Sequence, residues 1–284
     1  MAFTPADAKL AYDEAAVFVR EHSPRHAGTV RGRLAAGWIL DHVSRTGVDA
    51  SLDTFKAMSP NGEKTFTNVI VEFPSEDPSA PWIIVMSHFD TTPNGGKDFQ
   101  GANDGASTTG LLIALAAVIN RVEKMKDNIA LVWTDAEECC REYGPNDGFQ
   151  GSRRLVELFR EKRRPVNCAI CLDMLGDRDL NIIIPGNGEP TLRRLAMTAA
   201  ERAGVADCVK LRDDIVVKDD HQAFLDAGCA AIDLIDFEFG SAPGLNDYWH
   251  TPADTIDKIS EKSLLKSGKL VTEILHLLDI RKKQ

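Results

Sequence analysis

Three apolar segments of this chain each run into acidic or histidine side chains, and this pattern constrains the fold more than any other feature. The segments and their polar ends are Trp82 to Met86 before His88 and Asp90, Asn128 to Thr134 before Glu137 and Glu138, and Asn167 to Leu172 before Asp173. Short continuous apolar runs are typical of strands that are covered on both faces, as in a parallel sheet. Ligands bind beyond the carboxyl ends of such strands, so we expect the functional site where these polar residues gather.

The remaining segments carry the patterns of helices and further strands. Helices are expected over five stretches: Asp7 to Glu21, Val30 to Trp38, Leu111 to Val122, Pro190 to Ala203, and the segment that follows a Ser260 cap. Further strands are expected over four: Val48 to Phe55, Thr65 to Phe73, Leu180 to Ile184 and Ala230 to Ile235. The turn-rich segment Ser59-Pro60-Asn61-Gly62 joins the first two of these strands as a hairpin. Strands that alternate with helices predict an α/β sandwich, largely parallel in its centre, and the lack of a repeat or linker predicts one domain over residues 1–284.

The charge balance argues against one class of partner. The 284 residues include 43 Asp and Glu against 33 Lys and Arg, which gives a formal charge of -10. A chain this acidic repels phosphate groups, so we expect no nucleic acid partner. Gly110 to Ile119, the longest strongly apolar stretch, is too short to span a bilayer, so it predicts a buried helix and no membrane partner.

The six cysteines are too few for a fold built on disulfides. Cys168 and Cys171 form a C-x-x-C inside an apolar run, but no second pair lies at the spacing of a zinc ribbon. Free cysteine is among the most buried residue types, so we expect both to be core residues. The first residues show neither the basic nor the apolar part of an export signal, and nothing in the sequence indicates an oligomeric state.

Five side chains at strand ends or in adjoining loops are candidate metal ligands: His88, Asp104, Glu138, Asp173 and His250. Two imidazoles with three carboxylates suit zinc or a similar first-row ion, whereas calcium and magnesium prefer oxygen ligands alone. Each one taken singly has a simpler explanation as a loop hydrogen-bonding group or, for Asp104, a helix cap.

Glu137 and Glu138 are neighbours at the end of a strand, where successive side chains point in different directions. One can therefore bind a metal while the other faces a substrate as a general base, the division that metal-assisted hydrolysis requires. The alternative is a solvated acidic turn.

Five motifs occur in the order found in the M28 family of zinc metallopeptidases, which the chain resembles over roughly residues 10 to 280. They are Ser87-His88-Phe89-Asp90, Gly101-Ala102-Asn103-Asp104-Gly105-Ala106-Ser107, Asp135-Ala136-Glu137-Glu138, Leu172-Asp173-Met174-Leu175-Gly176-Asp177 and Trp249-His250-Thr251-Pro252-Ala253-Asp254-Thr255. The resemblance implies a three-layer α/β/α sandwich with a mixed, twisted sheet, like that of zinc-dependent exopeptidases. It also implies one or two zinc ions, peptide or protein N-termini as substrates, and export more often than a cytosolic location.

The same resemblance implies roles for individual residues. Asp104 would bridge two metals, with His88 and Asp173 on one and Glu138 and His250 on the other. Glu137 would be the base, with Asp173 and Asp219 also in the catalytic site. A cis peptide bond is expected between Asp104 and Gly105, where it is costly without proline.

Three further features resemble the glutaminyl cyclase branch of this family. They are the segment from Tyr143 to Arg153 after the Glu pair, the triplet Asp219-Asp220-His221, and Trp249 directly before His250. This resemblance implies substrate contacts for Tyr143, Asp219, His221 and Trp249. Alternatively, Trp249 packs only to orient His250, and the Asp219 triplet is a helix cap.

The peptidase branch is matched by Asn103 and by Met174-Leu175-Gly176-Asp177, which lie around the expected metal, and Tyr143 replaces a tryptophan of vertebrate cyclases. The sequence therefore slightly favours an aminopeptidase, in which metal-activated water hydrolyses the first peptide bond. The alternative is a glutaminyl-peptide cyclotransferase, which forms N-terminal pyroglutamate. A non-catalytic peptide-binding module is a remote third hypothesis, since no ligand and no base has been lost.

Overall fold

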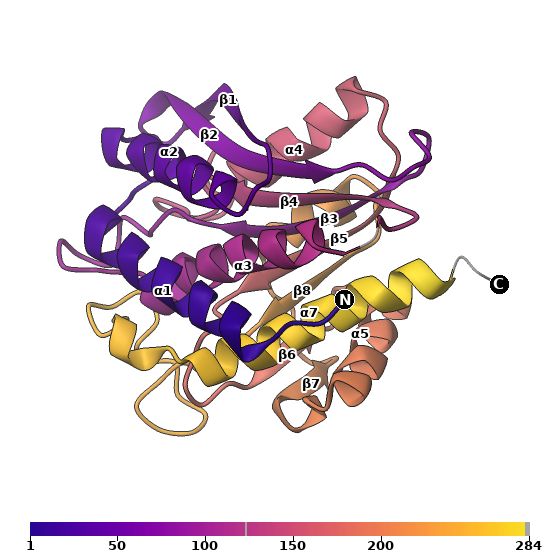
Figure 1. Ribbon diagram of the computed structural model, residues 1–284. Helices are drawn as coiled ribbons and strands as arrows, with labels where there is room; N and C mark the ends of the chain where they lie inside the picture. Colours follow the sequence, from indigo (N-terminus) through magenta and orange to yellow (C-terminus); the bar gives the residue numbers. More distant parts are fainter. Residues whose placement is uncertain (123, 282–284) are drawn as a thin grey trace.

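Eight strands form one twisted sheet in the computed structural model of the protein, which describes residues 1–122 and 124–281 (Figure 1). The strands are β1 (Ala50–Ser59), β2 (Gly62–Phe73), β3 (Trp82–His88), β4 (Asn128–Thr134), β5 (Val166–Asp173), β6 (Ile182–Pro185), β7 (Val209–Arg212) and β8 (Ala231–Ile235). The α-helices are α1 (Pro5–His22), α2 (Val30–Ser44), α3 (Thr108–Asn120), α4 (Gln150–Glu161), α5 (Pro190–Ala203), α6 (His221–Asp226) and α7 (Glu261–Arg281). Short turns of other helix types lie at Ala102–Ser107, Ala206–Cys208 and Ile256–Lys258.

The sheet has the order β1-β2-β4-β3-β5-β8-β6-β7 and is parallel in its centre. The four central strands β4, β3, β5 and β8 run parallel to one another, whereas the flanking β2 is antiparallel to β4, and β6 is antiparallel to β8. The expected hairpin is present, with β1 antiparallel to β2 and Ser59 opposite Gly62 at its turn. The prediction of a mixed, centrally parallel sheet is confirmed.

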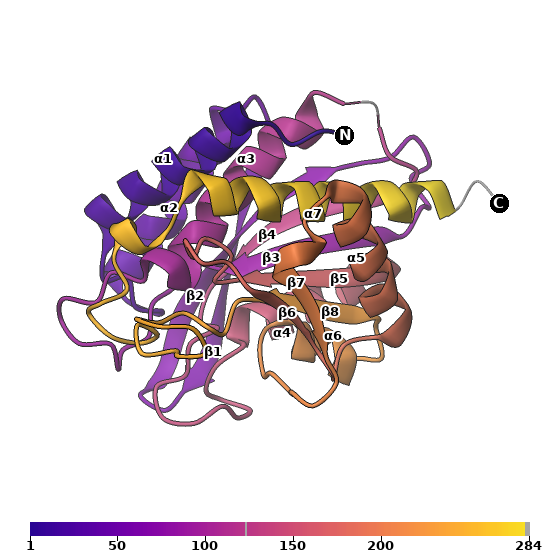
Figure 2. The ribbon, with the colours of Figure 1, turned by 90° about the horizontal axis from the view of Figure 1, so that it is seen from below.

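Helices cover both faces of the sheet and create two cores (Figure 2). On one face, α1, α2, α3, α5 and α7 share a core with Ile83 and Val85 of β3; on the other, α4 and α6 share a core with Ile84 and Met86. Successive side chains of a strand point to opposite faces, so β3 needs apolar residues at every position. This is why the central strands read as continuous apolar runs, and the three-layer architecture is confirmed.

The predicted core cysteines lie on these two faces. Cys168 of β5 belongs to the core on the first of these faces, and Cys171 belongs to the core on the other, each about 1% exposed. Residues three apart on a strand point in opposite directions, so the two thiols cannot chelate one ion. The prediction that both are core residues is confirmed.

The segment Ala102–Asn120 is long and apolar enough to cross a membrane by composition, but 94% of it is buried inside the fold. Its main part, α3, lies against the sheet and is covered by α1, as expected for a buried core helix (Figure 1).

The spacing of apolar residues in α2 did not predict how much of that helical face is buried. Val30 and Leu34 are 63% and 60% exposed, although Trp38 on the same helical face is buried. The described elements cover only the second half of this face, so helical spacing predicted the helix but not the extent of its burial.

Candidate active site

The polar residues that follow the parallel strands meet at one edge of the sheet. His88 ends β3, Asp173 ends β5, and Glu137 and Glu138 follow β4 after a short turn. Because β3 pairs in parallel with both β4 and β5, their carboxyl ends lie together. Asp104, in the wide turn before α3, and His250, in the loop after β8, reach the same place.

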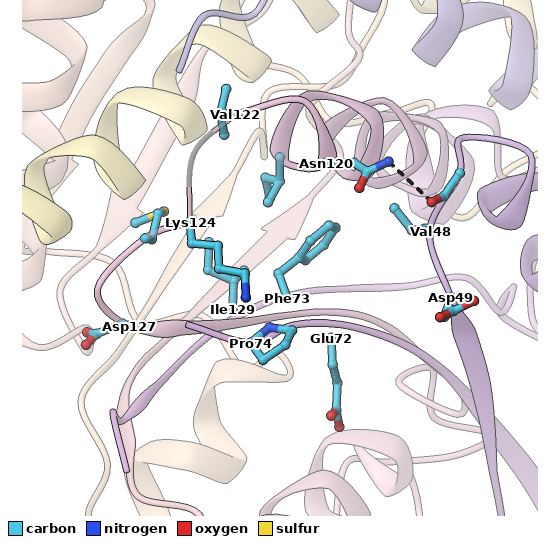
Figure 3. Close-up of a pocket in the computed structure, with 13 residues that line it drawn as sticks. Val48, Asp49, Glu72, Phe73, Pro74, Asn120, Val122, Lys124, Asp127 and Ile129 are labelled. Carbon is cyan, nitrogen blue, oxygen red and sulfur yellow. Dashed lines mark hydrogen bonds between the residues drawn. The ribbon is translucent and has the colours of Figure 1, made fainter. Parts of the chain in front are cut away.

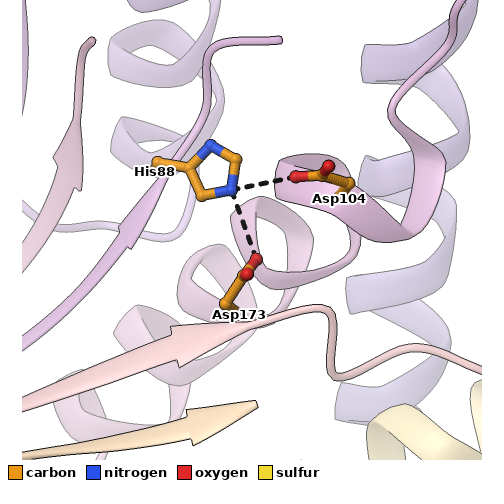
Figure 4. Close-up of side chains that lie close together, drawn as sticks. All are labelled: His88, Asp104 and Asp173. Atoms are coloured by element: carbon orange, nitrogen blue, oxygen red, sulfur yellow. Dashed lines mark hydrogen bonds and ion pairs between the residues drawn. The ribbon is translucent and has the colours of Figure 1, made fainter. Parts of the chain in front are cut away.

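The five candidate ligands form two groups that share Asp104. In the first, His88 Nε2 lies 3.1 Å from Asp104 Oδ1 and 3.2 Å from Asp173 Oδ1 (Figure 4). In the second, His250 Nε2 lies 3.2 Å from Glu138 Oε1 and 3.4 Å from Asp104 Oδ2. The ligand atoms within each group are all within 4.8 Å of one another. Each group therefore offers the nitrogen and oxygen ligands that zinc accepts.

The chemistry of these side chains fits a cation. Both carboxylate oxygens of Glu138 are buried and neither receives a well-aligned hydrogen bond, although His250 lies close to one. Burial and the neighbouring Asp104 raise the pKa of Glu138 to about 8. A buried carboxylate without donors is costly, and a bound metal ion would supply the missing positive charge.

Strained backbone positions occur beside three of the ligands. Ala136, Met174 and His250 all have positive φ values, of 60°, 55° and 57°. Such conformations are uncommon outside glycine and cluster at functional sites. Ala136 and Met174 turn the chain just after β4 and β5, and His250 itself takes this conformation in the loop after β8.

The expected cis peptide bond between Asp104 and Gly105 is not present. Within residues 1–122 and 124–281, the bond between Ser23 and Pro24 is cis. The turn at Asp104 is made instead by its non-helical ψ of 93° and by Gly105 at φ 88°, where a side chain would meet the His88 ring at 3.1 Å. Glycine adopts this conformation without strain, so the close approach needs no cis bond.

Three residues to which the sequence assigned no role hold the ligand segments in place. Asp90 accepts hydrogen bonds from the backbone N–H groups of Glu137 (3.1 Å) and Glu138 (3.3 Å). Asp254 accepts from the N–H groups of Asn103 (2.7 Å) and Asp104 (3.1 Å). Asp90 lies two residues after the ligand His88, and Asp254 lies four residues after the ligand His250. Their places inside the quoted motifs are the sequence feature that could have indicated a supporting role.

Arg25 is the third supporting residue, and its side chain is fully buried. Its guanidinium donates to the carbonyl oxygens of Phe89, Gln100 (2.8 Å) and Gly101 (2.9 Å). It therefore connects the segment after His88 to the turn that carries Asp104. No motif marked Arg25, because its partners are backbone carbonyls far away in the sequence.

A cavity of about 300 Å³ opens onto the two ligand groups. Asp104, Glu137, Glu138, Tyr143, Asp173, Asp219, Trp249 and His250 line it, together with Ile215, Val216, Val217, Lys218, Ile235 and Phe237. Tyr143 Oη donates to Glu137 Oε1 at 3.2 Å. Burial raises the pKa of Glu137 well above its usual range, and nearby Asp219 adds to the effect. A carboxyl group with a raised pKa beside a metal site is suited to proton transfer near neutral pH.

Trp249 lies in a position that suits both roles considered for it. Its ring stacks on the His250 imidazole, with centroids 3.9 Å apart and planes 25° apart, and it also lines the cavity. Trp249 can therefore orient the ligand and contact a substrate.

Asp219 lines the cavity as expected, and burial together with Asp173 raises its pKa to about 7.

His221, which the sequence placed among the substrate contacts, does not line this cavity. It is fully buried at the start of α6, and its Nε2 lies 2.9 Å from Asn187 Nδ2. The triplet diverges at this point because the helix begins at His221, which turns the imidazole inward while Asp219 stays at the cavity. The structure therefore places His221 away from the cavity lining, at the start of a helix as in the alternative interpretation.

A second cavity, of about 400 Å³, lies at the opposite ends of the strands (Figure 3). Phe73 at the end of β2, Ile129 near the start of β4 and Asn120 at the end of α3 contribute to its lining. Neither of the two candidate ligand groups contributes a residue to its lining, so the candidate metal ligands gather at the other edge of the sheet.

The family model "Peptidase family M28" matches residues 68–275, a range that holds all five candidate ligands and Glu137. The chain belongs to peptidase family M28. This M28 enzyme is 29% identical over 250 residues to the glutaminyl-peptide cyclotransferase-like protein of Mus musculus, with 78% of this chain and 60% of that protein covered. It is 26% identical to the glutaminyl-peptide cyclotransferase of Drosophila melanogaster, with 83% and 72% covered. The chain thus spans about three fifths of the length of the mouse relative.

Solved structures of two kinds resemble this M28 enzyme. The glutaminyl cyclase of an Acidobacteriales bacterium superposes with a TM-score of 0.89 at 30% identity, over 99% of this chain and 96% of that one. A leucine aminopeptidase precursor from Bacteroides thetaiotaomicron superposes with a TM-score of 0.83 at 22% identity, over 97% and 98%. The second likeness shows the shared fold alone.

Proposed function

We propose that this M28 enzyme is a zinc-dependent glutaminyl-peptide cyclotransferase, which converts an N-terminal glutamine of a peptide or protein into pyroglutamate. The observation that carries the proposal is the similarity to the Acidobacteriales glutaminyl cyclase, at 30% identity over almost the whole length of both chains. The motifs alone put an aminopeptidase slightly ahead, and the cyclotransferase relatives reverse that order.

The residues present can hold the metal that the reaction needs. Asp104, Glu138 and His250 form one group of zinc ligands, and Asp104, His88 and Asp173 form another. When bound, zinc supplies a Lewis acid that polarises the γ-carbonyl of the terminal glutamine.

The chain's own groups then bind the substrate and move one proton. The α-amine attacks the carbonyl carbon of the side-chain amide (Cδ), a new C–N bond closes the five-membered ring, and the bond from Cδ to the amide nitrogen breaks to release ammonia. Glu137, with its raised pKa, takes a proton from the α-amine and passes it to the leaving nitrogen. Tyr143 orients the Glu137 carboxyl through its hydrogen bond, while the aromatic ring of Trp249 keeps water from the reacting carbon.

The aminopeptidase alternative has one specific observation in its favour. His88, Asp104 and Asp173 offer ligand atoms within 4.8 Å of one another, as do Asp104, Glu138 and His250, so the residues for a second metal ion are present. Two metal ions, when bound, would supply the Lewis acid chemistry for hydrolysis of the first peptide bond, and Glu137 would take a proton from the attacking water.

The deciding experiment is mass spectrometry of the zinc-loaded protein with two short peptides, one beginning with Gln and one with Leu. Loss of ammonia from the Gln peptide alone is the expected result. Release of whole N-terminal residues would instead establish the aminopeptidase, and no product from either peptide would favour the binding module. A chelated sample controls for spontaneous cyclisation.

The variant Glu137→Gln is the matched test of the proton carrier. It should keep the bound zinc, because Glu137 belongs to neither ligand group, but lose about 100-fold or more in kcat. Zinc content by elemental analysis and the rate of ammonia release check the two parts. Full activity in Glu137→Gln would remove Glu137 from the mechanism.

A further inference from the structure

The cavity has an uneven charge distribution at its mouth. Lys218 contributes the one Lys or Arg side chain among the residues that line the cavity, where five acidic residues also lie. Its side chain is exposed, whereas the neighbouring Asp219 and Asp220 are 3% and 0% exposed. Lys218 therefore stands at the rim, and the carboxylates form the floor.

No hydrogen bond or ion pair holds the Lys218 ammonium to any residue in the described parts of the chain. The acidic residues of the same segment are already engaged: Asp213 pairs with Arg193 at 2.6 Å and Asp214 with Arg212 at 2.7 Å. The ammonium is thus available to a group that arrives from solution.

The backbone that carries Lys218 is fixed. Asn187 Nδ2 donates to the carbonyl of Val217 at 2.8 Å, and the Val217 N–H donates back to Asn187 Oδ1 at 3.3 Å. On the other side, the chain enters the buried Asp219 and Asp220. The position of Lys218 at the mouth is therefore set, and only its side chain is free to swing.

Apolar side chains lie beside it at the mouth. Val216 is 71% exposed and Phe237 is 37% exposed, and the Phe237 ring lies 5.2 Å from that of Trp249. A terminal residue that reaches the buried carboxylates fills the inner part of a 300 Å³ cavity, so the next residue of the peptide lies at this rim.

We propose that Lys218 recognises an acidic side chain at the second position of the peptide, whose aliphatic part packs on Val216 and Phe237. This inference rests on the proposed function, since it assigns a substrate preference to that same site. The five floor carboxylates alone would favour a basic second residue, so an acidic preference is diagnostic of Lys218.

The test compares kcat/KM for three peptides that begin Gln-Glu, Gln-Lys and Gln-Ala, the last being the neutral reference. The wild type should prefer the acidic over the basic peptide by about three- to tenfold, as expected for a partly exposed ion pair, and about 0.5 M salt should remove most of the preference. Lys218→Met should lose the preference, and Lys218→Glu should reverse it.

Lys210→Glu is the matched control, because it makes the same change in net charge on β7, at an exposed position outside the cavity lining. It should keep the wild-type ratio. Equal rates for the acidic and basic peptides in the wild type would overturn the proposal, as would a reversal in Lys210→Glu equal to that in Lys218→Glu.

The same spectra separate this inference from the proposed function. Cyclisation of the Gln-Ala peptide without any charge preference would leave the cyclotransferase standing and remove the role of Lys218. Release of whole N-terminal residues instead of ammonia would overturn the cyclotransferase. The ratio of the release rates from the acidic and basic peptides would still confirm or refute the role of Lys218 in recognising the second residue. No product from any peptide would overturn both.

Discussion

Asp104 is the residue on which both ligand groups depend, since one of its carboxylate oxygens lies in each. The sequence could predict Asp104 and the other four ligands because residue type and motif order carry that information. It could not predict Arg25, whose partners are carbonyl groups 64 to 76 residues away. Such partners are fixed only when the loops are folded, so support of this kind is visible in the structure alone.

His221 shows how a motif residue can serve stability. Burial lowers the pKa of its imidazole to about 4, so the folded protein disfavours the protonated form that the unfolded chain accepts near pH 6.5. The free energy of unfolding that this residue contributes is therefore present above pH 6.5 and is lost as the pH falls toward 4.

Between pH 7 and pH 5, the free energy of unfolding of the wild type should fall by about 2 kcal/mol more than that of the variant His221→Gln. Glutamine keeps an acceptor for Asn187 but has no proton to gain. Urea unfolding of the two metal-free proteins at both pH values measures the difference, in which all other titrating groups cancel. Equal losses in the two proteins would show that His221 is not the acid-sensitive group.

The secondary structure elements differ in how far the sequence predicted them. The bounds of β4 and α5 match the expected Asn128 to Thr134 and Pro190 to Ala203, because β4 is a continuous apolar run between polar residues and α5 lies between Pro190 and Gly204. β7, a strand of four residues, was missed, and the antiparallel direction of β6 was not predicted. Short edge elements owe their form to tertiary pairing, which no local pattern encodes.

Close packing between α1 and α3 depends on one glycine. A Cβ on Gly110 would lie 2.1 Å from the carbonyl oxygen of Ala11, so the two backbones touch where no side chain fits. We expect Gly110→Ala to lower the free energy of unfolding by about 1 to 3 kcal/mol, because the helices must move apart within a packed core.

Gly37→Ala in α2 is the matched control, since a Cβ there meets no atom within 4 Å. Alanine is the better helix former, so this change should raise the free energy of unfolding by about 0.5 to 1 kcal/mol. Urea midpoints of both variants test the contrast. A Gly110→Ala protein as stable as the wild type would mean that α1 and α3 do not pack this closely.

For the molecule as a whole, the sandwich brings together acidic groups that the chain alone does not neutralise. The net charge is -10, and buried carboxylates such as Glu138, Asp173 and Asp254 have pKa values raised by burial. The α/β architecture followed from the alternation of strands and helices, but the density of buried charge did not, because it depends on which loops meet at the sheet edge.

This density predicts that metal removal destabilises the protein. Zinc in about 100-fold excess over its dissociation constant should raise the free energy of unfolding by about 2.7 kcal/mol per site relative to the chelated protein. The gain should shrink as the pH falls, since protons compete with the metal for Glu138 and His250. Thermal unfolding with zinc and with chelator, together with elemental analysis, measures the gain and the number of ions. Asp104→Asn weakens both ligand groups, so this variant should lose most of the stabilisation by zinc. Asp53→Asn is the matched control and should retain it, because Asp53 lies on β1 and pairs with Arg154 of α4. Equal unfolding temperatures with and without zinc in the wild type would contradict a metal site at these residues.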